Sequence, residues 1–140
     1  SSFKPDIIQL PLNILDNHLY HSGILDELYN KCIEIHARSV FLQGLFYLND
    51  AEINKRFSRV LPYLKKLKLI AEKCNLNLAE LSLLWLLSLK EVSKVVIGVD
   101  NAKQLSSHLK TVKKTIDSNI IEEALSIHFE NDKILNPSNW

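Results

Sequence analysis

The sequence predicts an α/β fold in which short parallel strands alternate with helices. Three segments are apolar and short enough to be buried strands, at residues 6–13, 32–39 and 94–99. The stretches after them carry apolar residues three or four positions apart, the spacing of a helix face. Continuous apolar strands joined through helices are typical of a parallel sheet with crossover helices.

The composition is that of an ordinary globular domain. The 140 residues are 46% hydrophobic and 24% charged, with a formal net charge of +1. This length suits one domain or a piece of a larger one, and we expect residues 1–140 to form a single piece. We expect neither a nucleic-acid nor a membrane partner, because the basic excess typical of such proteins is missing and no apolar run approaches ~20 residues.

The cysteines and the missing methionine bear on the origin of the chain. Cys32 and Cys74 have no CxxC partner, so the sequence predicts neither a disulfide framework nor a zinc site, and no other metal site is indicated. No signal-peptide pattern occurs, and we expect two buried free thiols in a cytoplasmic protein. No methionine occurs, even at position 1, so we expect a processed chain or a fragment.

In the first half of the chain, Pro11 should end the first strand because proline cannot donate to a ladder. Ser22 is positioned to cap a helix over residues 22–31. After the second strand, residues 40–55 are expected to form a long, partly apolar loop. His18 and His21 precede the first helix and are expected on the surface.

In the second half, the pattern predicts helices over 56–74 and 77–90. Pro62 is tolerated near a first turn, and Asn75 suits the left-handed residue that closes a helix. The inward-facing residues of the second helix are expected to be Leu81, Leu84, Trp85 and Ser88. The remaining expected features are a helix capped by Asp100 or Asn101 and running to about 114, a helix over about 119–129, and a turn-rich tail anchored by Trp140.

Three strand–helix units would be too few to close a sheet, since a barrel of eight such units needs roughly 250 residues.

Five motifs occur in a fixed order along the chain: IIQLPLNILD, IEIHARSVFLQG, LAELSLLWLLS, VIGVDNAKQLSSH and LNPSNW. Together they resemble the C-terminal half of an aldo/keto reductase, from about Phe3 to Trp140. The resemblance implies the C-terminal portion of a (β/α)8 TIM barrel, about strands six to eight with their helices.

The resemblance assigns roles at the ends of the first two strands, where such barrels carry their functional residues. Gln9 matches a glutamine that binds the nicotinamide carboxamide; a buried glutamine bonded to backbone is the alternative. Arg38 stands where the family usually has a stacking tyrosine, and a guanidinium can stack or bind phosphate. Its alternative is an ion pair with a carboxylate from a loop missing from this chain.

The loop after the second strand matches a family segment whose backbone wraps the cofactor pyrophosphate. Ser39, Gln43 and Gly44 match that segment, and Phe41 lies inside it. Val40 replaces the family's proline, which leaves the course of the loop open.

The segment after the third strand matches the phosphate and adenosine site of the family. A strand followed by a helix start also favours an anion physically. The residues assigned to this part are Gly98, Asp100, Asn101, Gln104 and His108. Simple helix capping remains the alternative for Asp100 and Asn101. Lys103, Lys110 and Lys114 are expected to support the phosphate site.

The resemblance implies an NAD(P)H-dependent oxidoreductase acting on a small carbonyl substrate, with NADP the family preference. Asp100 leaves NAD open, because a carboxylate repels a 2′-phosphate and can accept a bond from a ribose hydroxyl. The family's catalytic tetrad of Asp, Tyr, Lys and His lies on earlier strands, and its motifs are absent here, so no catalytic residue is assigned. By itself, the chain should be inactive, and its open sheet edges should need the N-terminal half or self-association. The alternatives are a regulatory or interaction protein of the same family and a stand-alone half-barrel module.

Overall fold

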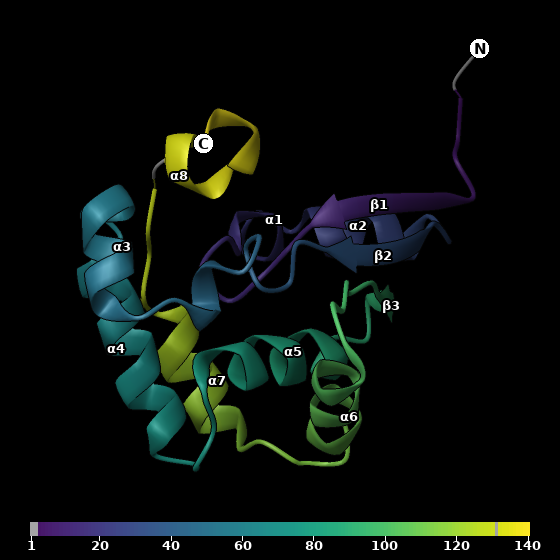
Figure 1. Ribbon diagram of the computed structural model, residues 1–140. Helices are drawn as coiled ribbons and strands as arrows, with labels where there is room; N and C mark the ends of the chain where they lie inside the picture. Colours follow the sequence, from purple (N-terminus) through teal and green to yellow (C-terminus); the bar gives the residue numbers. More distant parts are fainter. Residues whose placement is uncertain (1–2, 131) are drawn as a thin grey trace.

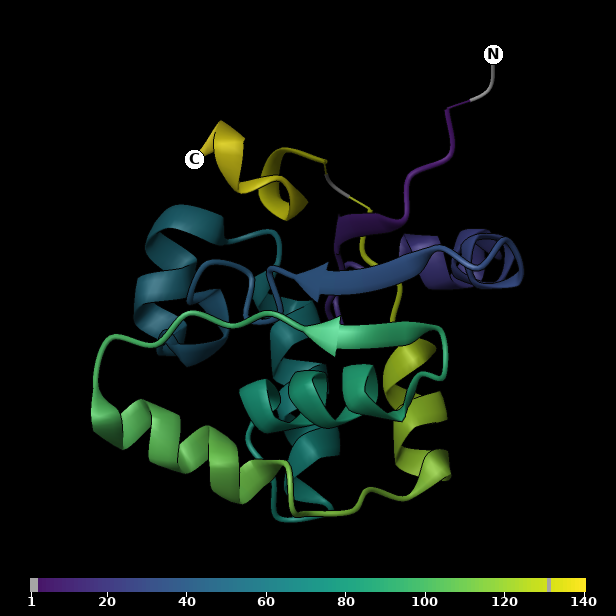
Figure 2. The ribbon, with the colours of Figure 1, turned by 90° about the vertical axis from the view of Figure 1, so that its right-hand side faces the viewer.

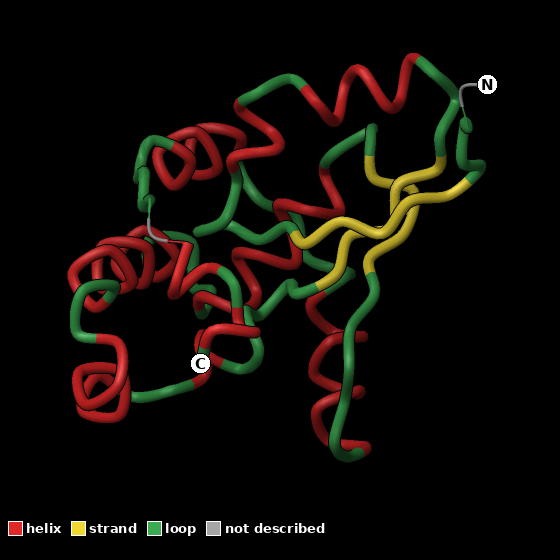
Figure 3. Tube along the Cα trace, turned by 90° about the horizontal axis from the view of Figure 1, so that it is seen from above, coloured by secondary structure: helices red, strands yellow, loops and turns green. Residues whose placement is uncertain are grey.

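Residues 3–130 and 132–140 are described by the computed structural model, which alternates strands with helices (Figure 1). The three strands are β1 (Ile7–Pro11), β2 (Glu34–Arg38) and β3 (Val92–Val95). They form one parallel sheet in the order β1-β2-β3, lying side by side with a visible twist in Figures 2 and 3. The predicted α/β class with a parallel sheet is therefore confirmed.

One face of the sheet packs on the helices and the other does not. On β2, Ile35 and Ala37 are fully buried, whereas Arg38 on the alternate side is exposed. Ile7 on β1 is 50% exposed. The expectation of buried strands is therefore wrong for this second face. We call the uncovered side the open face; its side chains come from Ile7, Gln9, Glu34, His36, Arg38 and Lys94.

The helices lie on the other side of the sheet and at its ends. They are α1 (His18–His21), α2 (Ile24–Asn30), α3 (Asp50–Phe57), α4 (Leu61–Glu72), α5 (Leu78–Ser88), α6 (Ala102–Thr111), α7 (Ser118–Leu125) and α8 (Asp132–Leu135). Two 3-10 turns, η1 (Leu45–Tyr47) and η2 (Pro137–Asn139), complete the structure. In the described ranges, every helix is too short or too polar to cross a membrane.

The predicted helix over 22–31 starts later than expected. Ser22 ends α1 and donates its hydroxyl hydrogen to the carbonyl oxygen of Leu19, so it caps nothing downstream. Gly23 occupies the N-cap of α2 at φ 78°, a conformation that glycine adopts at little cost. His18 and His21 are exposed as expected, although they belong to α1 and not to a loop.

The expectation of a loop over 40–55 was wrong, because a helix begins inside it. Asn49 and Glu52 form a capping box, each side chain accepting the backbone N–H of the other, and this starts α3. The predicted helix over 56–74 is therefore the end of α3 followed by α4. Pro62 lies in the first turn of α4 and Asn75 has φ 56°, both as predicted.

The lysine-rich face of α4 is not uniformly exposed. Lys68 is half-buried, and its Nζ lies 2.9 Å from Oδ1 of Asp50, while Lys65 lies 3.5 Å from the other carboxylate oxygen. This network lowers the pKa of Asp50, chiefly through the Lys68 hydrogen bond. It ties α4 to the start of α3.

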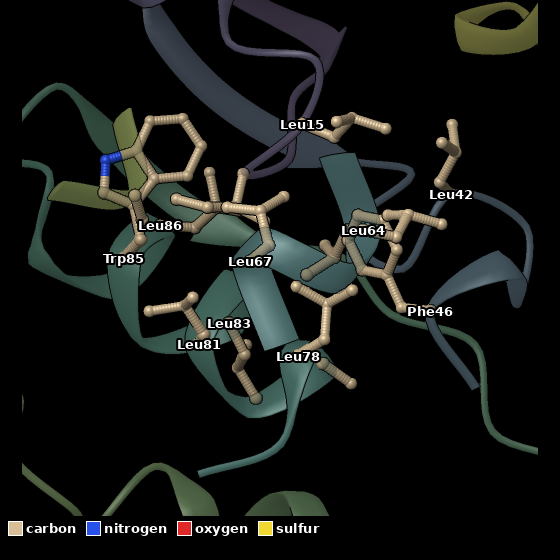
Figure 4. Packing of buried hydrophobic residues seen from close by; sticks show 14 of the residues in the cluster. Leu15, Leu42, Phe46, Leu64, Leu67, Leu78, Leu81, Leu83, Trp85 and Leu86 are labelled. Atoms are coloured by element: carbon tan, nitrogen blue, oxygen red, sulfur yellow. The ribbon is translucent and has the colours of Figure 1, made fainter. Parts of the chain in front are cut away.

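Helix α5 forms the centre of the core (Figure 4). Asn77 and Glu80 form a second capping box at its start. Trp85 is fully buried, as predicted, and its indole N–H has no acceptor in the described part of the chain. Ser88 is exposed, against prediction, because the helix ends there and its hydroxyl donates back to the carbonyl of Trp85.

The C-terminal part differs from prediction mainly at element boundaries. β3 ends at Val95, so most of the segment 94–99 is an exposed connection and not a buried strand. α7 ends at Leu125, earlier than the predicted boundary near 129. Trp140 packs on Phe57, with ring centroids 4.6 Å apart, and donates its indole N–H to the carbonyl of Ile134, as an anchor should. The predicted start of the tail, Asn131, lies outside the described residues.

The cysteines are less buried than expected. Cys32 is exposed at the tight turn that leads into β2, and its φ is 55°. Cys74 is half-buried and its thiol donates to the carbonyl of Ala71 at the end of α4. Neither forms a disulfide, and the expectation of two buried thiols was wrong.

Candidate functional site

The loop after β2 has an unusual backbone. Ser39, Leu42, Gln43 and Gly44 have φ values of 58°, 45°, 51° and 83°, all in the left-handed region. Glycine adopts this conformation freely, but each of the other residues costs about 1 kcal/mol or more there. Such strain persists only where surrounding contacts fix the backbone, and it is common at binding sites.

Asn13 supplies one of these contacts from the loop after β1. Its side chain is fully buried, and its Nδ2 donates to the carbonyl of Ser39 at 3.1 Å. Its Oδ1 accepts the backbone N–H groups of Leu15 and Asp16 at 3.1 and 2.8 Å. One asparagine therefore holds its own turn and the start of the next loop.

Ser82 supplies the second contact from the middle of α5. Its buried hydroxyl donates to the carbonyl of Val40 at 2.8 Å and accepts the backbone N–H of Ile14 at 3.2 Å. Sequence reasoning missed both Asn13 and Ser82. The available signals were an asparagine directly after a strand and a lone serine in an apolar helical run.

A cavity of about 360 Å³ lies between this loop and the segment that leads into α6. Nine of the twelve predicted cofactor residues line it: Ser39, Val40, Phe41, Gln43, Gly44, Gly98, Asp100, Gln104 and His108. Tyr47, Val96 and Ile97 complete the lining. The two segments meet because the C-terminal ends of neighbouring parallel strands lie at one edge of the sheet: the N–H of Val96 donates to the carbonyl of Ala37 at 2.8 Å.

Aromatic side chains form one wall of this cavity. His108 stacks on Phe41, with ring centroids 5.0 Å apart and planes 12° from parallel. Tyr47 meets the edge of Phe41 at 5.4 Å. Partial burial raises the pKa of Tyr47, and the nearby Glu80 carboxylate adds to the effect. The near-parallel rings of Phe41 and His108 and the neutral phenol of Tyr47 therefore form an aromatic wall, which suits a planar ring system.

The backbone of the loop offers hydrogen-bond donors. The N–H groups of Val40, Phe41 and Gln43 donate to no acceptor within the described residues. Successive N–H groups in turns with left-handed residues form concave sites that favour anions. The donor chemistry on this side of the cavity therefore fits a phosphate or pyrophosphate group.

The three other predicted residues lie outside the cavity. Gln9 and Arg38 are both exposed on the open face, and Arg38 donates to Oγ of Ser39 at 3.3 Å. The alternative of a buried Gln9 is wrong, because Gln9 is exposed. The alternative for Arg38, a carboxylate from a missing loop, stays a prediction. Asn101 caps α6 by accepting the N–H of Gln104 at 2.9 Å, as its alternative proposed.

The three lysines expected to support a phosphate do not line this cavity. Gln104 and His108, four residues apart, share the face of α6 that meets the cavity, while Lys103 and Lys110 are exposed elsewhere on the helix. Lys114 instead pairs with Glu80 at 2.7 Å. Burial alone would raise the pKa of Glu80, but the bonds from Lys114, Asn77 and Thr111 together lower it below its usual value.

Two further observations concern metal ligands and a second cavity. Over residues 3–130 and 132–140, no group of three His, Cys, Asp or Glu side chains could hold a metal ion. A second cavity, of about 460 Å³, lies beside α1 and is lined partly by His18, His21 and His128. It contains none of the predicted cofactor residues.

Comparison with known proteins gives the family. The model of the aldo/keto reductase family matches residues 1–127. The chain belongs to the aldo/keto reductase family. Among curated relatives, the L-glyceraldehyde 3-phosphate reductases of Escherichia coli O157:H7 and of strain K12 are 27% and 28% identical to it. Each alignment covers 77% of this chain and 37% of the relative, so the chain spans little more than a third of their length.

Solved structures support the fold. A thermostable aldo-keto reductase, Tm1743, in complex with the inhibitor epalrestat, superposes with a TM-score of 0.67 at 18% identity, covering 86% of this chain and 39% of that one. The glycerol dehydrogenase AKR11B4 from Gluconobacter oxydans gives 0.69 at 19% identity, covering 89% and 43%. At such identities the likeness concerns the fold alone.

Proposed function

We propose that this chain forms the sixth, seventh and eighth strand–helix units of a (β/α)8 barrel that reduces small carbonyl compounds with NAD(P)H. Three features support the barrel: the parallel order β1-β2-β3, the helices on one side of the sheet, and the open face on the other. In a closed barrel, such a face lines the interior and is packed by the side chains of other strands. The share of the relatives that the chain spans agrees with this assignment.

The observation that carries the proposal is the cavity beside the loop 39–44. Sequence reasoning assigned twelve residues to one cofactor, and nine of them converge on this one cavity. The N–H groups of Val40, Phe41 and Gln43 would hold the pyrophosphate. Gln104 and His108, with the aromatic wall, would hold the adenosine.

Gln9 and Arg38 would bind the nicotinamide end. Both lie on the open face. Gln9 pairs in register with His36, and His36 lies on the same side of β2 as Arg38 because successive strand residues alternate between the two faces. The Gln9 amide can donate and accept at once, as a carboxamide partner must, and Arg38 can stack through its planar guanidinium. The missing family tyrosine at position 38 makes this the least usual part of the site.

The chemistry would be divided between this chain and the rest of the protein. When bound, NAD(P)H supplies the hydride that reduces a carbonyl carbon. The residues named above bind and orient it, and Asn13 and Ser82 keep the loop 39–44 in its strained course. No acid–base tetrad is assigned to this chain, so the proton donor belongs to the remainder of the barrel.

The first test is the size of the native protein, by immunoblot of cell extract with an antibody against this chain. A full barrel requires a band near twice the chain's 16.1 kDa. A band at the mass of the chain alone would contradict the barrel and favour a stand-alone half-barrel module.

The second test is cofactor binding by the intact protein, followed by nicotinamide fluorescence. We expect Gln9→Ala to weaken binding about tenfold, the scale of one lost good hydrogen bond, and Lys66→Ala on the exposed face of α4 to have no effect. Equal effects would remove Gln9 from the site. Tight binding without reduction of any carbonyl compound would favour a regulatory member of the family.

A further inference from the structure

A further property of the cavity is its choice between the two dinucleotides, NAD and NADP. The inference about this choice rests on the proposed function. NADP differs from NAD by one phosphate on the adenosine ribose, which carries between one and two negative charges at neutral pH. Proteins accommodate that phosphate with Arg or Lys, whereas an acidic side chain accepts a hydrogen bond from the free 2′-hydroxyl. The charges near Gln104 and His108 therefore decide between the two cofactors.

The described lining of the cavity contains an acid and no Lys or Arg. Asp100, at the entrance to α6, is the one Asp or Glu among the twelve residues that line it. It is exposed, so its carboxylate can turn toward a ligand. On this side, the cavity presents negative charge where a 2′-phosphate would need positive charge.

Two of the amides around the start of α6 already have acceptors within the chain. The N–H of Gln104 is taken by Oδ1 of Asn101 at 2.9 Å, and the N–H of Asp100 is taken by Oε1 of Gln104 at 2.8 Å. Free N–H groups at a helix start are the donors that a phosphate would use, and Gln104 lies in the first turn of α6. Neutral amide oxygens satisfy these two groups, and a phosphate bound to either of them would have to displace the amide oxygen.

The cations on segments around the cavity are paired with other groups or lie off its lining. Lys114 pairs with the Glu80 carboxylate, and Arg38 bonds Ser39 at the far side, where β2 ends. Lys103 is exposed and lies off the face of α6 that carries Gln104 and His108. Because its side chain is flexible, Lys103 is the remaining candidate for a phosphate contact, and the experiment therefore includes a variant at this position.

From these observations, we propose that the site selects NAD(H) over NADP(H) and that Asp100 determines the choice. The carboxylate accepts a hydrogen bond from the ribose 2′-hydroxyl and repels a 2′-phosphate. Because like charges in close contact cost more than about 1.4 kcal/mol, a factor of ten, we expect NADH to bind at least tenfold more tightly than NADPH.

The experiment titrates the intact protein with NADH and with NADPH, using isothermal calorimetry in a buffer without phosphate. We expect Asp100→Asn to raise NADPH affinity about fivefold while weakening NADH slightly, and Asp100→Arg to reverse the preference, because each step removes repulsion or adds attraction. Lys103→Ala is the matched control from the same helix start and should leave the ratio unchanged. Circular dichroism checks that each exposed-site variant folds.

The outcomes of these titrations distinguish the proposed NAD(H) selectivity from the proposed function on which it rests. Binding of both dinucleotides with NADPH equal or tighter would overturn the selection of NAD(H) and leave the cofactor site standing. An unchanged ratio in both Asp100 variants, or a loss of NADPH binding in Lys103→Ala, would overturn the role of Asp100. No binding of either dinucleotide would overturn the proposed function itself, and the selectivity with it.

Discussion

Helix α5 and the sheet share one core but differ in how completely they are enclosed. Eight of the eleven residues of α5 are buried, among them Trp85 at its centre. By contrast, β3 has no buried residue, and β1 has Ile7 half exposed. Parallel sheets in α/β proteins are normally covered on both faces, so the sheet is the unusual member of the pair.

The difference shows which side of the sheet is enclosed by the described residues. The helical side closes around α5, with α4 and the strand-end loops packed on it (Figure 4). The sheet keeps a polar and ionic open face, on which the Glu34 carboxylate lies 2.7 Å from His36 and 3.3 Å from Lys94. The His36 bond, followed by that from Lys94, lowers the pKa of Glu34. Most of the buried contacts therefore lie on the helical side, whereas the charged groups of the sheet lie on its open face.

The largest effect is expected in α5. Trp85→Ala should lower the free energy of unfolding by about 3–5 kcal/mol, because a fully buried indole leaves a large cavity. Leu87→Ala in the same helix, where the side chain is 47% exposed, should change it by less than about 0.5 kcal/mol. Urea unfolding measures both. Similar losses in the two variants would contradict the central place of α5.

The two faces of the sheet can be compared by replacing one isoleucine on each face with alanine. Ile35→Ala, on the helix side of β2, should cost about 2–4 kcal/mol, since Ile35 is fully buried. Ile7→Ala on the open face should cost less than about 0.5 kcal/mol in the chain alone. In the intact protein, a cost for Ile7→Ala close to that for Ile35→Ala would show that other strands cover the open face, as the barrel requires.

A smaller effect is expected where α5 meets the strand-end loops. Ser82→Ala should cost about 1–3 kcal/mol, because the carbonyl of Val40 and the N–H of Ile14 lose their buried partner. Hydrogen exchange should show faster exchange at the Ile14 amide. Ser88→Ala, at the exposed end of α5, is the control and should leave that amide unchanged. A neutral Ser82→Ala would mean that the loop 39–44 is held by other contacts.

The smallest effect concerns pH at the start of α5. The folded-state pKa of Glu80 lies below 4.5, so its contribution to stability is complete above about pH 4.5 and is lost as the pH falls through the lower folded value. Glu80→Gln keeps the capping box but removes the charge, so it should cost about 1 kcal/mol at neutral pH and nothing in strong acid.

Unfolding measured between pH 7 and pH 3 tests this dependence. Glu122→Gln, at an exposed position on α7, should keep the pH dependence of the unchanged protein. If Glu80→Gln loses stability in acid as steeply as the unchanged protein, Glu80 does not contribute in the stated way.

Several local features could be predicted because their causes are local. Pro62 fits only a first helical turn, Asn75 tolerates a left-handed backbone, and Asn101 caps the helix that follows it. The helix at Asn49 was missed although its capping box was present, because the apolar residues around it gave no clear period. Strand ends near Val95 were misplaced because exposed and buried valines look alike in a sequence.

By itself, the sequence determined the α/β class and the order of the three strands, and its resemblance to a family supplied the candidate dinucleotide residues. Only the tertiary structure decided which of them meet. Loop 39–44 and the segment from Gly98 to His108 are far apart along the chain, and parallel pairing brings their strand ends to one edge. Gln9 and Arg38 fall outside that cavity because strand alternation turns them to the open face. Local chemistry fixes caps and turns, whereas a shared site depends on pairing register and on packing between distant segments.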